Sequence, residues 1–205
     1  MQRTIKGLKS LASSLIISLL AISEVSVGVA TALIVESGQQ RIVFVRVAEG
    51  SNVNSRDVYT MGIDGTDLTK LTSRPDGNPA YLSSWSPDGT KIAYSTVSAG
   101  NNFDIYVMNA DGTDNHVVVD SGTPYFYFNW SPDSEKIMVY EVDPSTLGYS
   151  NEYSEIYSID IDGNNKQTLA TAGSDGIVRM FKYGVWSPDG TQVAFDAVIG
   201  NDNNI

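Results

Sequence analysis

Apolar and polar residues alternate over short stretches of this chain, and similar stretches recur along it. Three of them are Lys91–Tyr94, Lys136–Val139 and Gln192–Phe195. Alternation of this kind is typical of a β-strand. After the first thirty residues no segment keeps an apolar period of 3.6 residues, so we expect almost no helix.

Each of these strands follows a turn sequence that starts at a tryptophan. The signature residues are Trp85, Pro87, Asp88 and Gly89, then Trp130, Pro132 and Asp133, then Trp186, Pro188, Asp189 and Gly190. Proline presets φ at the second position of a tight turn, and glycine at the fourth accepts left-handed geometry. The pattern therefore predicts a hairpin turn after each tryptophan.

A second phrase recurs between these units, at Asp57–Thr66, Asp104–Thr113 and Glu155–Asn164. Each copy contains an Asp-Gly pair, which is a strong hairpin signal. The pairs are Asp64 with Gly65, Asp111 with Gly112, and Asp162 with Gly163. A short closing strand is expected after each pair. Each unit thus predicts four strands.

The spacing of the repeats indicates the fold class. The tryptophans are 45 and 56 residues apart, and the Asp-Gly pairs are 47 and 51 apart. Units of this length with four strands are typical of β-propeller blades. A weaker first copy appears at an offset of 50, which places Val35 over Trp85. We expect an all-β propeller of four-stranded antiparallel blades at about residues 33–72, 81–119, 125–170 and 183–205, the last one incomplete.

The two phrases together resemble the WD-type repeat of TolB-like β-propellers, over residues 33–205. The wider group includes a component of the Tol–Pal envelope system and the non-catalytic propeller of prolyl-oligopeptidase-like peptidases. The resemblance implies a propeller that carries a binding surface. About three and a half blades are present, whereas closed propellers have about four to eight. We therefore expect an incomplete, open piece of a larger propeller.

The first 32 residues have the layout of a secretory signal peptide. Arg3, Lys6 and Lys9 precede an apolar run, and Ala32 ends a stretch of small residues. A cut after Ser23 is the alternative. An uncleaved membrane anchor is disfavoured because serines and Glu24 interrupt the apolar span. We expect a periplasmic or secreted protein with no stable membrane span after cleavage.

Charge and composition exclude several kinds of chemistry. The net charge of −11 disfavours nucleic-acid binding, and the chain has no cysteine. The acidic stretch from Asp160 to Gly163 approaches a calcium loop, but Leu169 stands where the bidentate acid is needed. We expect a hairpin turn there, and no metal or cofactor. A cation in the central channel stays open as an alternative, although the sequence selects no ligands for it.

Nothing in the sequence indicates catalysis. The chain has no Gly-x-Ser-x-Gly motif, and His116 is its single histidine. The repeated aspartates are expected to close turns, and the tryptophans to pack between blades. The aromatic runs Tyr125–Phe128 and Met180–Tyr183 are expected on innermost strands, with alternate side chains toward the channel and toward the blade interface. These runs could pack between blades or line a peptide-binding mouth.

The expected function is an exported, non-catalytic scaffold that binds a protein or peptide partner. The loops Ala48–Arg56, Val97–Asn102 and Asp143–Ser154 vary in length and are polar, as is common where partners are recognised. One alternative is the propeller portion of a larger hydrolase, either prolyl-oligopeptidase-like or sugar-active. Another is a carbohydrate-binding propeller. The oligomeric state is left open.

Overall fold

The computed structural model describes residues 31–33, 41–47, 55–73, 78–98, 102–122, 126–141, 155–172 and 178–199. Within these ranges the regular structure is entirely β, as the absence of a helical period predicted. Accordingly, no helix there has the length and apolarity that a membrane crossing requires.

The described strands form four antiparallel sheets, and consecutive strands are neighbours in each. The first sheet contains β1 (Thr31–Leu33), β2 (Arg41–Val47), β3 (Arg56–Gly62) and β4 (Thr69–Lys70). The second contains β5 (Ala80–Trp85), β6 (Lys91–Val97), β7 (Phe103–Asn109) and β8 (His116–Asp120). The third contains β9 (Phe126–Trp130), β10 (Lys136–Glu141), β11 (Glu155–Asp160) and β12 (Gln167–Thr171). The fourth contains β13 (Val178–Trp186) and β14 (Val193–Ile199).

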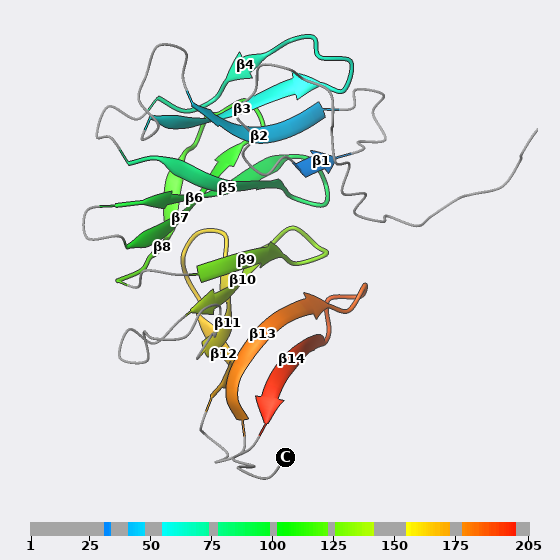
Figure 1. Cartoon of the computed structure of the whole chain (residues 1–205). Helices are drawn as coiled ribbons and strands as arrows, with labels where there is room; N and C mark the ends of the chain where they lie inside the picture. The colour runs from blue at the N-terminus through cyan, green and yellow to red at the C-terminus, as the bar shows by residue number, and fades with distance from the viewer. Residues whose placement is uncertain are drawn as a thin grey trace, which may run out of the picture.

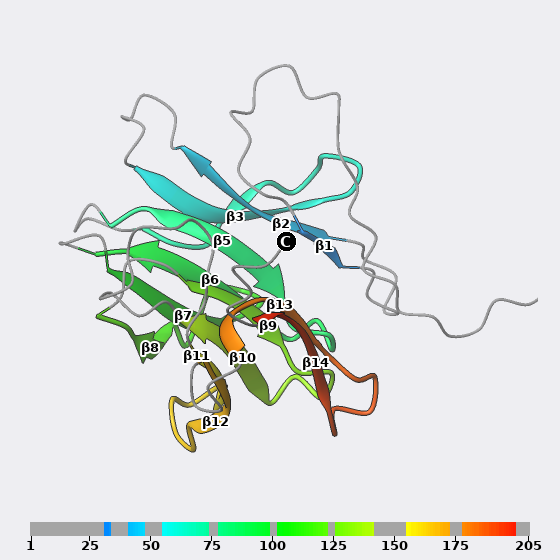
Figure 2. The same cartoon turned by 60° about the horizontal axis from the view of Figure 1, so that its bottom comes forward.

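The sheets follow one another in chain order through the molecule, with the first and last at opposite ends (Figure 1). Viewed from another side, the strand order within the second and third sheets can be followed outward from β5 and from β9 (Figure 2). This is the architecture of propeller blades. The described residues form an open arrangement of three complete blades and half of a fourth.

Apolar side chains fill the space between successive blades. Ile92 and Tyr94 of β6 pack with Val43 and Val58 of the first sheet. Ala93, between them in sequence, packs on the other side with Ile137 of the third sheet and its neighbours. Because successive strand residues point to opposite faces, one strand contributes to two separate cores. The burial of both faces explains why these strands are more apolar than a half-exposed strand would be.

The third and fourth sheets share a smaller core. Met138, Tyr140 and Ile156 form its buried part, and Trp186 and Val193 pack against them. Phe195 on β14 remains exposed, at 39% of its maximum accessible surface. The packing between the last two sheets is therefore less complete than that between the second and third.

The position of the first innermost strand corrects the sequence alignment. Ala32 pairs with Ile42, as Trp85 pairs with Ile92, so Ala32 and not Val35 takes the place of the tryptophan. The connection between these partners is three residues longer in the first blade than in the second. A fixed offset of 50 cannot account for a connection that contains extra residues. In addition, β1 spans the expected cut after Ala32, which would leave only Leu33 of this strand.

Candidate functional site

The two edges of the blades differ in their connections. The turns between first and second strands and between third and fourth strands lie on one edge, where Lys91 pairs with Asn109 and Lys136 with Asp160. We call this edge the turn face. The connections 48–55, 98–102 and 142–154, which vary more in length, join strand ends at the opposite edge, where Val97 pairs with Phe103 and Glu141 with Glu155. We call this edge the loop face.

Each Trp-Ser-Pro-Asp turn is closed by its aspartate. In the second blade, Asp88 Oδ1 accepts hydrogen bonds from Ser86 Oγ at 2.6 Å and from Thr90 N at 3.0 Å. Ser86 Oγ in turn accepts a bond from Lys91 N at 2.9 Å. Partial burial alone would raise the pKa of Asp88, but the hydrogen bonds from Ser86 and Thr90 outweigh it and lower that pKa.

The same network recurs in the next two blades. Ser131 Oγ donates to Asp133 Oδ1 at 2.5 Å, and Ser187 Oγ donates to Asp189 Oδ1 at 2.5 Å. Hydrogen bonds from Ser187 and Thr191 lower the pKa of Asp189 to about 2. These carboxylates are occupied by the turn that contains them, which leaves little of their bonding capacity for a ligand.

The fourth position of the turn links neighbouring blades. Gly89 and Gly190 have φ near +70°, and Ser134 adopts φ of +66° at the corresponding place. This agrees with the left-handed geometry expected from the turn pattern. The buried Ser134 hydroxyl accepts a bond from Asp88 N of the preceding blade at 3.1 Å. Here a serine accepts an unfavourable backbone conformation and forms a bond between blades.

The Asp-Gly turns form a second series on the turn face. Asp111 Oδ1 accepts bonds from Thr113 Oγ1 at 2.6 Å and from Thr113 N at 3.0 Å. Equivalent bonds involve Asp64 with Thr66 and Asp162 with Asn164. These contacts lower the pKa of all three aspartates.

Glycine is required in these turns for two reasons. Gly112 has φ of +88°, and a Cβ added there would lie 3.1 Å from the carbonyl oxygen of Leu71 in the preceding blade. Gly163 has φ of +82°, and a Cβ added there would lie 3.3 Å from the carbonyl oxygen of Val118 in the preceding blade. Gly65, in the first blade, has the same φ but open space around it. In the second and third blades the glycine of the Asp-Gly pair therefore also allows the preceding blade to approach closely.

The three signature tryptophans lie between sheets. Trp85 is 9% exposed and packs with residues of the first and second sheets. Trp130 packs on the core between the second and third sheets and donates from Nε1 to Ser84 O at 3.3 Å. Trp186 packs on the core between the third and fourth sheets. None of the three has the broad exposed ring face that sugar stacking needs.

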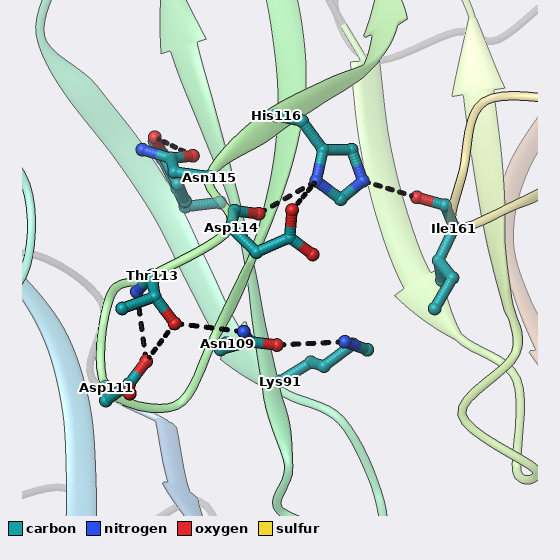
Figure 3. Close-up of polar contacts among 9 residues, drawn as sticks. Lys91, Asn109, Asp111, Thr113, Asp114, Asn115, His116 and Ile161 are labelled. Atoms are coloured by element: carbon teal, nitrogen blue, oxygen red, sulfur yellow. Dashed lines mark hydrogen bonds and ion pairs between the residues drawn. The ribbon is translucent and has the colours of Figure 1, made fainter.

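His116 forms a link between blades that the sequence did not indicate. Its Nε2 lies 3.0 Å from the carbonyl oxygen of Ile161, in the turn after β11 of the third blade, and its Nδ1 lies 2.8 Å from Asp114 O. Figure 3 shows the ring between these two partners. Both partners are acceptors, so a neutral imidazole can donate to only one of them, and the imidazolium form donates to both. Only the distance from β8 to the next blade, which sequence spacing does not report, could have revealed this contact.

The acidic stretch at Asp160 does not form an open cation site. Asp160 pairs with Lys136 and accepts a bond from Asn165 Nδ2 at 2.7 Å. Asp162 is bonded to Asn164 within the turn. Among the described residues no three His, Cys, Asp or Glu side chains gather closely enough to hold a metal ion.

The innermost aromatic strand follows the blade-packing alternative, and none of its described aromatic side chains lines a channel. Phe128 is 5% exposed and packs between the second and third sheets, and Tyr127 packs between the third and fourth. Neither side chain points into a channel, because both faces of a blade are covered by its neighbours and only the strand edge faces inward. The other side chains of the two aromatic runs lie outside the described set.

A group of charged side chains in the third blade was also missed by the sequence reading. Lys166 Nζ lies 3.1 Å from Glu155 Oε2 and 3.8 Å from the centre of the Tyr157 ring. Burial raises the pKa of the Tyr157 phenol, and the carboxylates of Glu141 and Glu155 raise it further. The phenol therefore stays neutral.

On the loop face an arginine and two aromatic rings meet between the first two blades. Arg56 Cζ lies 4.5 Å from the centre of the Tyr81 ring, and the rings of Tyr81 and Phe103 are 5.7 Å apart. Tyr81 is 37% exposed. The three residues stand at the ends of β3, β5 and β7, beside the connections of varied length. We call this group the Arg56 cluster. The loop 143–154, expected to contact a partner, lies outside the described residues.

A cleft of about 340 Å³ lies between the third and fourth sheets. Its apolar lining comes from Leu169, Trp186, Val193 and Phe195. Ser158 and Gln167 add polar groups on the side of the third sheet.

Comparison with known proteins supports the fold. No family model and no curated protein matches the chain. Among solved structures, oligogalacturonate lyase in complex with manganese matches with a TM-score of 0.55 and 16% identity, over 76% of this chain and 41% of the lyase. A protein from Agrobacterium tumefaciens described as TolB matches with a TM-score of 0.53 and 20% identity, over 82% of this chain and 70% of that one. An acylaminoacyl peptidase from Pyrococcus horikoshii matches with a TM-score of 0.50 and 14% identity, over 80% and 27%.

These likenesses establish the fold, which is a TolB-like β-propeller. The chain spans less than half of the lyase and about a quarter of the peptidase.

Proposed function

We propose that this chain is a non-catalytic propeller scaffold that binds a protein or peptide partner on its loop face. The observation that carries the proposal is the Arg56 cluster, in which Arg56 covers a partly exposed Tyr81 ring. Arginine and aromatic residues are enriched where proteins recognise one another. The acidic residues of the turn face are mostly occupied in their own turns, so that face offers less to a partner.

The proposal includes export through the N-terminal segment. The basic start and apolar run support a signal peptide. A cut after Ser23 fits the fold better than a cut after Ala32, because it keeps β1 whole and paired with β2. The proposed location is the periplasm or the cell exterior. Mass spectrometry of the exported protein gives its N-terminus and decides between the two cuts.

Substitution on the loop face tests the binding proposal. Tyr81→Ser removes the exposed ring, and Ile63→Ser is the matched control, because Ile63 is 53% exposed but lies on the turn face. These two proteins, and a variant in which residues 143–154 are replaced by a glycine-serine linker of equal length, are first checked by thermal melting and then used to recover partners from an envelope extract. We expect Tyr81→Ser and the linker variant to reduce recovery several-fold and Ile63→Ser to leave it unchanged. Equal recovery by all variants would exclude the loop face.

A second candidate is the propeller portion of a larger hydrolase. It is favoured by the likeness to the peptidase, of which this chain spans 27%. It requires catalytic sequence elsewhere in the same gene product. Sequencing the transcript on both sides of the 205 codons tests it, since a reading frame without a hydrolase domain would exclude it.

A further inference from the structure

Two arginines at the loop face have no oxygen partner. Arg46 lies near the end of β2 and Arg56 begins β3, and within the part of the chain that the structure describes neither forms a hydrogen bond or an ion pair. Other described cationic side chains do bond to oxygen atoms of the chain; these are Arg41, Lys70, Lys91, Lys136 and Lys166. In a chain with a net charge of −11, an arginine that no acid neutralises is unexpected.

Arg56 is not neutralised by Asp57, the next residue, because the two side chains lie on opposite faces of the first sheet. Val58 packs with the second sheet, so Arg56, two residues earlier in the same strand, faces that sheet too. Asp57 faces the other side, where it pairs with Lys70 Nζ at 2.7 Å and accepts a hydrogen bond from Thr72 Oγ1 at 3.0 Å. The first sheet therefore leaves the Arg56 guanidinium able to bind a further anion.

The second sheet holds this guanidinium against an aromatic ring. The Arg56 Cζ lies 4.5 Å from the centre of the Tyr81 ring, and Arg56 is half-buried. A cation–π contact uses the face of the ring and leaves the guanidinium N–H donors available to an oxygen ligand. Among the described residues the Tyr81 hydroxyl also has no hydrogen-bond partner. The Arg56 cluster thus presents unpaired donors beside the partly exposed ring of Tyr81 and, 5.7 Å from it, the ring of Phe103.

These groups fit a carboxylate that lies close to an aromatic side chain. A guanidinium binds a carboxylate through two parallel hydrogen bonds, and such charge-assisted bonds are stronger than neutral ones. An aromatic side chain can pack on the Tyr81 and Phe103 rings in offset or edge-to-face contact. Side chains on the same side of an extended peptide are two residues, or about 6.6 Å, apart. This spacing is similar to the 5.7 Å between the two rings of the cluster.

We propose that the Arg56 cluster binds an acidic segment of a protein partner, in which an aspartate or glutamate pairs with Arg56 and an aromatic residue two positions away packs on Tyr81 and Phe103. This site is the one proposed above for partner binding, and its ligand rests on that proposed function. Because Tyr81 already orients the guanidinium, less side-chain freedom is lost on binding. A nucleic acid is a poorer occupant, since the net charge of −11 repels a chain of phosphates, whereas one carboxylate needs only a local positive charge.

Three capped pentapeptides are the probes. The test peptide reads glycine, aspartate, serine, phenylalanine, glycine; one control has asparagine in place of aspartate, and the other has alanine in place of phenylalanine. Each is titrated into the ¹⁵N-labelled full chain while amide signals are followed. We expect the test peptide to give saturable shifts in β5 and at the start of β3, and each control to bind about fivefold more weakly because it lacks one of the two contacts. Added salt should weaken binding of the test peptide more than that of the asparagine control.

Three variants of the protein locate the carboxylate. Arg56→Gln removes the charge, and Arg46→Gln is the matched control, because Arg46 lies opposite Asp57 in the pairing of β2 with β3 and so faces the other side of the sheet. Arg56→Lys keeps the charge but loses the planar set of donors. Thermal melting first shows which variants are folded. We expect Arg56→Gln to weaken binding of the test peptide about fivefold, Arg56→Lys to weaken it less, and Arg46→Gln to leave it unchanged.

Equal binding of the aspartate and asparagine peptides, equal effects of Arg56→Gln and Arg46→Gln, or the absence of binding would overturn the proposal. Equal binding of the alanine control, together with displacement by inorganic phosphate, would indicate a general anion site and would also overturn it. The same variants are then used to recover partners from the envelope extract. Recovery that falls with Tyr81→Ser but not with Arg56→Gln would keep the loop-face function and exclude the acidic ligand. Recovery unchanged by Tyr81→Ser as well would exclude the loop face itself.

Discussion

Tyr140 of the third blade donates a hydrogen bond from its phenol to Gly184 O of the fourth blade, at 2.6 Å in a buried position. Asn129 Nδ2 donates to the same carbonyl oxygen at 3.0 Å. Gly184 lies where the pairing of β13 with β14 changes register. A Cβ at this position would be 2.9 Å from the Tyr140 hydroxyl. The half-blade is thus joined to its neighbour by a polar contact as well as by the small apolar core.

Replacement of Tyr140 by phenylalanine is expected to destabilise the fold by about 1 kcal/mol, because Asn129 still satisfies the carbonyl group. Gly184→Ala is expected to cost more, since its methyl group collides with the hydroxyl. The double variant should be more stable than the sum of the single effects predicts, because the colliding hydroxyl is absent. Urea denaturation of the four proteins measures this, and strict additivity would contradict direct contact.

Gly65 and Gly112 have similar positive φ angles, but only Gly112 lies close to a neighbouring blade. Substitutions at the two positions therefore distinguish the cost of backbone strain from the cost of a steric contact. Gly65→Ala introduces only the left-handed conformation and is expected to cost about 1 kcal/mol. Gly112→Ala adds a contact of 3.1 Å with Leu71 O and is expected to cost at least about 1 kcal/mol more. Thermal and urea unfolding give both values. Equal losses would show that the blade spacing at Leu71 adjusts freely.

Two substitutions of Ser134 distinguish the cost of its positive φ from the contribution of its hydrogen bond. Ser134→Ala keeps the side chain at positive φ but loses the bond from Asp88 N, and we expect a loss of about 1–2 kcal/mol. Ser134→Gly loses the same bond but relieves the strain, so its loss should be smaller. Denaturant unfolding ranks the two variants. The reverse order would mean that strain at Ser134 is negligible.

His116→Ala should weaken the contact between the second and third blades. Loss of the bond to Ile161 O is expected to cost about 1 kcal/mol, because the ring is only partly buried. The matched control is Gln167→Ala, 51 residues further on at the corresponding strand start, where the side chain is exposed. Hydrogen exchange of the Asp-Gly turn at Asp162 should accelerate in the first variant only. Acceleration in both would indicate a general loss of stability.

Acid should destabilise this protein through its turn aspartates. Their folded-state pKa values lie below the ordinary 3.8, and that of Asp189 is about 2. The unfolded chain therefore binds more protons in this range. The stability that these groups contribute is complete above about pH 5 and is lost as the pH falls through their folded-state values. Denaturation between pH 2 and 7 measures the slope, which should flatten when Asp88, Asp133 and Asp189 are all changed to asparagine.

Much of the fold could be read from local pattern. Alternation predicted the strands, and Pro-Asp-Gly and Asp-Gly predicted the turns, because these features depend on the backbone preferences of neighbouring residues. The position of the innermost strand of the first blade was predicted wrongly, since the longer connection to β2 breaks any fixed offset. For the aromatic run at Tyr127 the sequence left channel lining and blade packing open, and the structure shows packing, because blade stacking covers both faces of the strand.

The sequence by itself determined that this protein is a repeat of four-stranded blades, because each blade carries its own turn signals and strand pattern. The tertiary structure alone decided which groups from different blades meet: Ser134 with Asp88, His116 with Ile161, and Tyr140 with Gly184. These partners are 44 to 46 residues apart and depend on the stacking distance and twist between sheets.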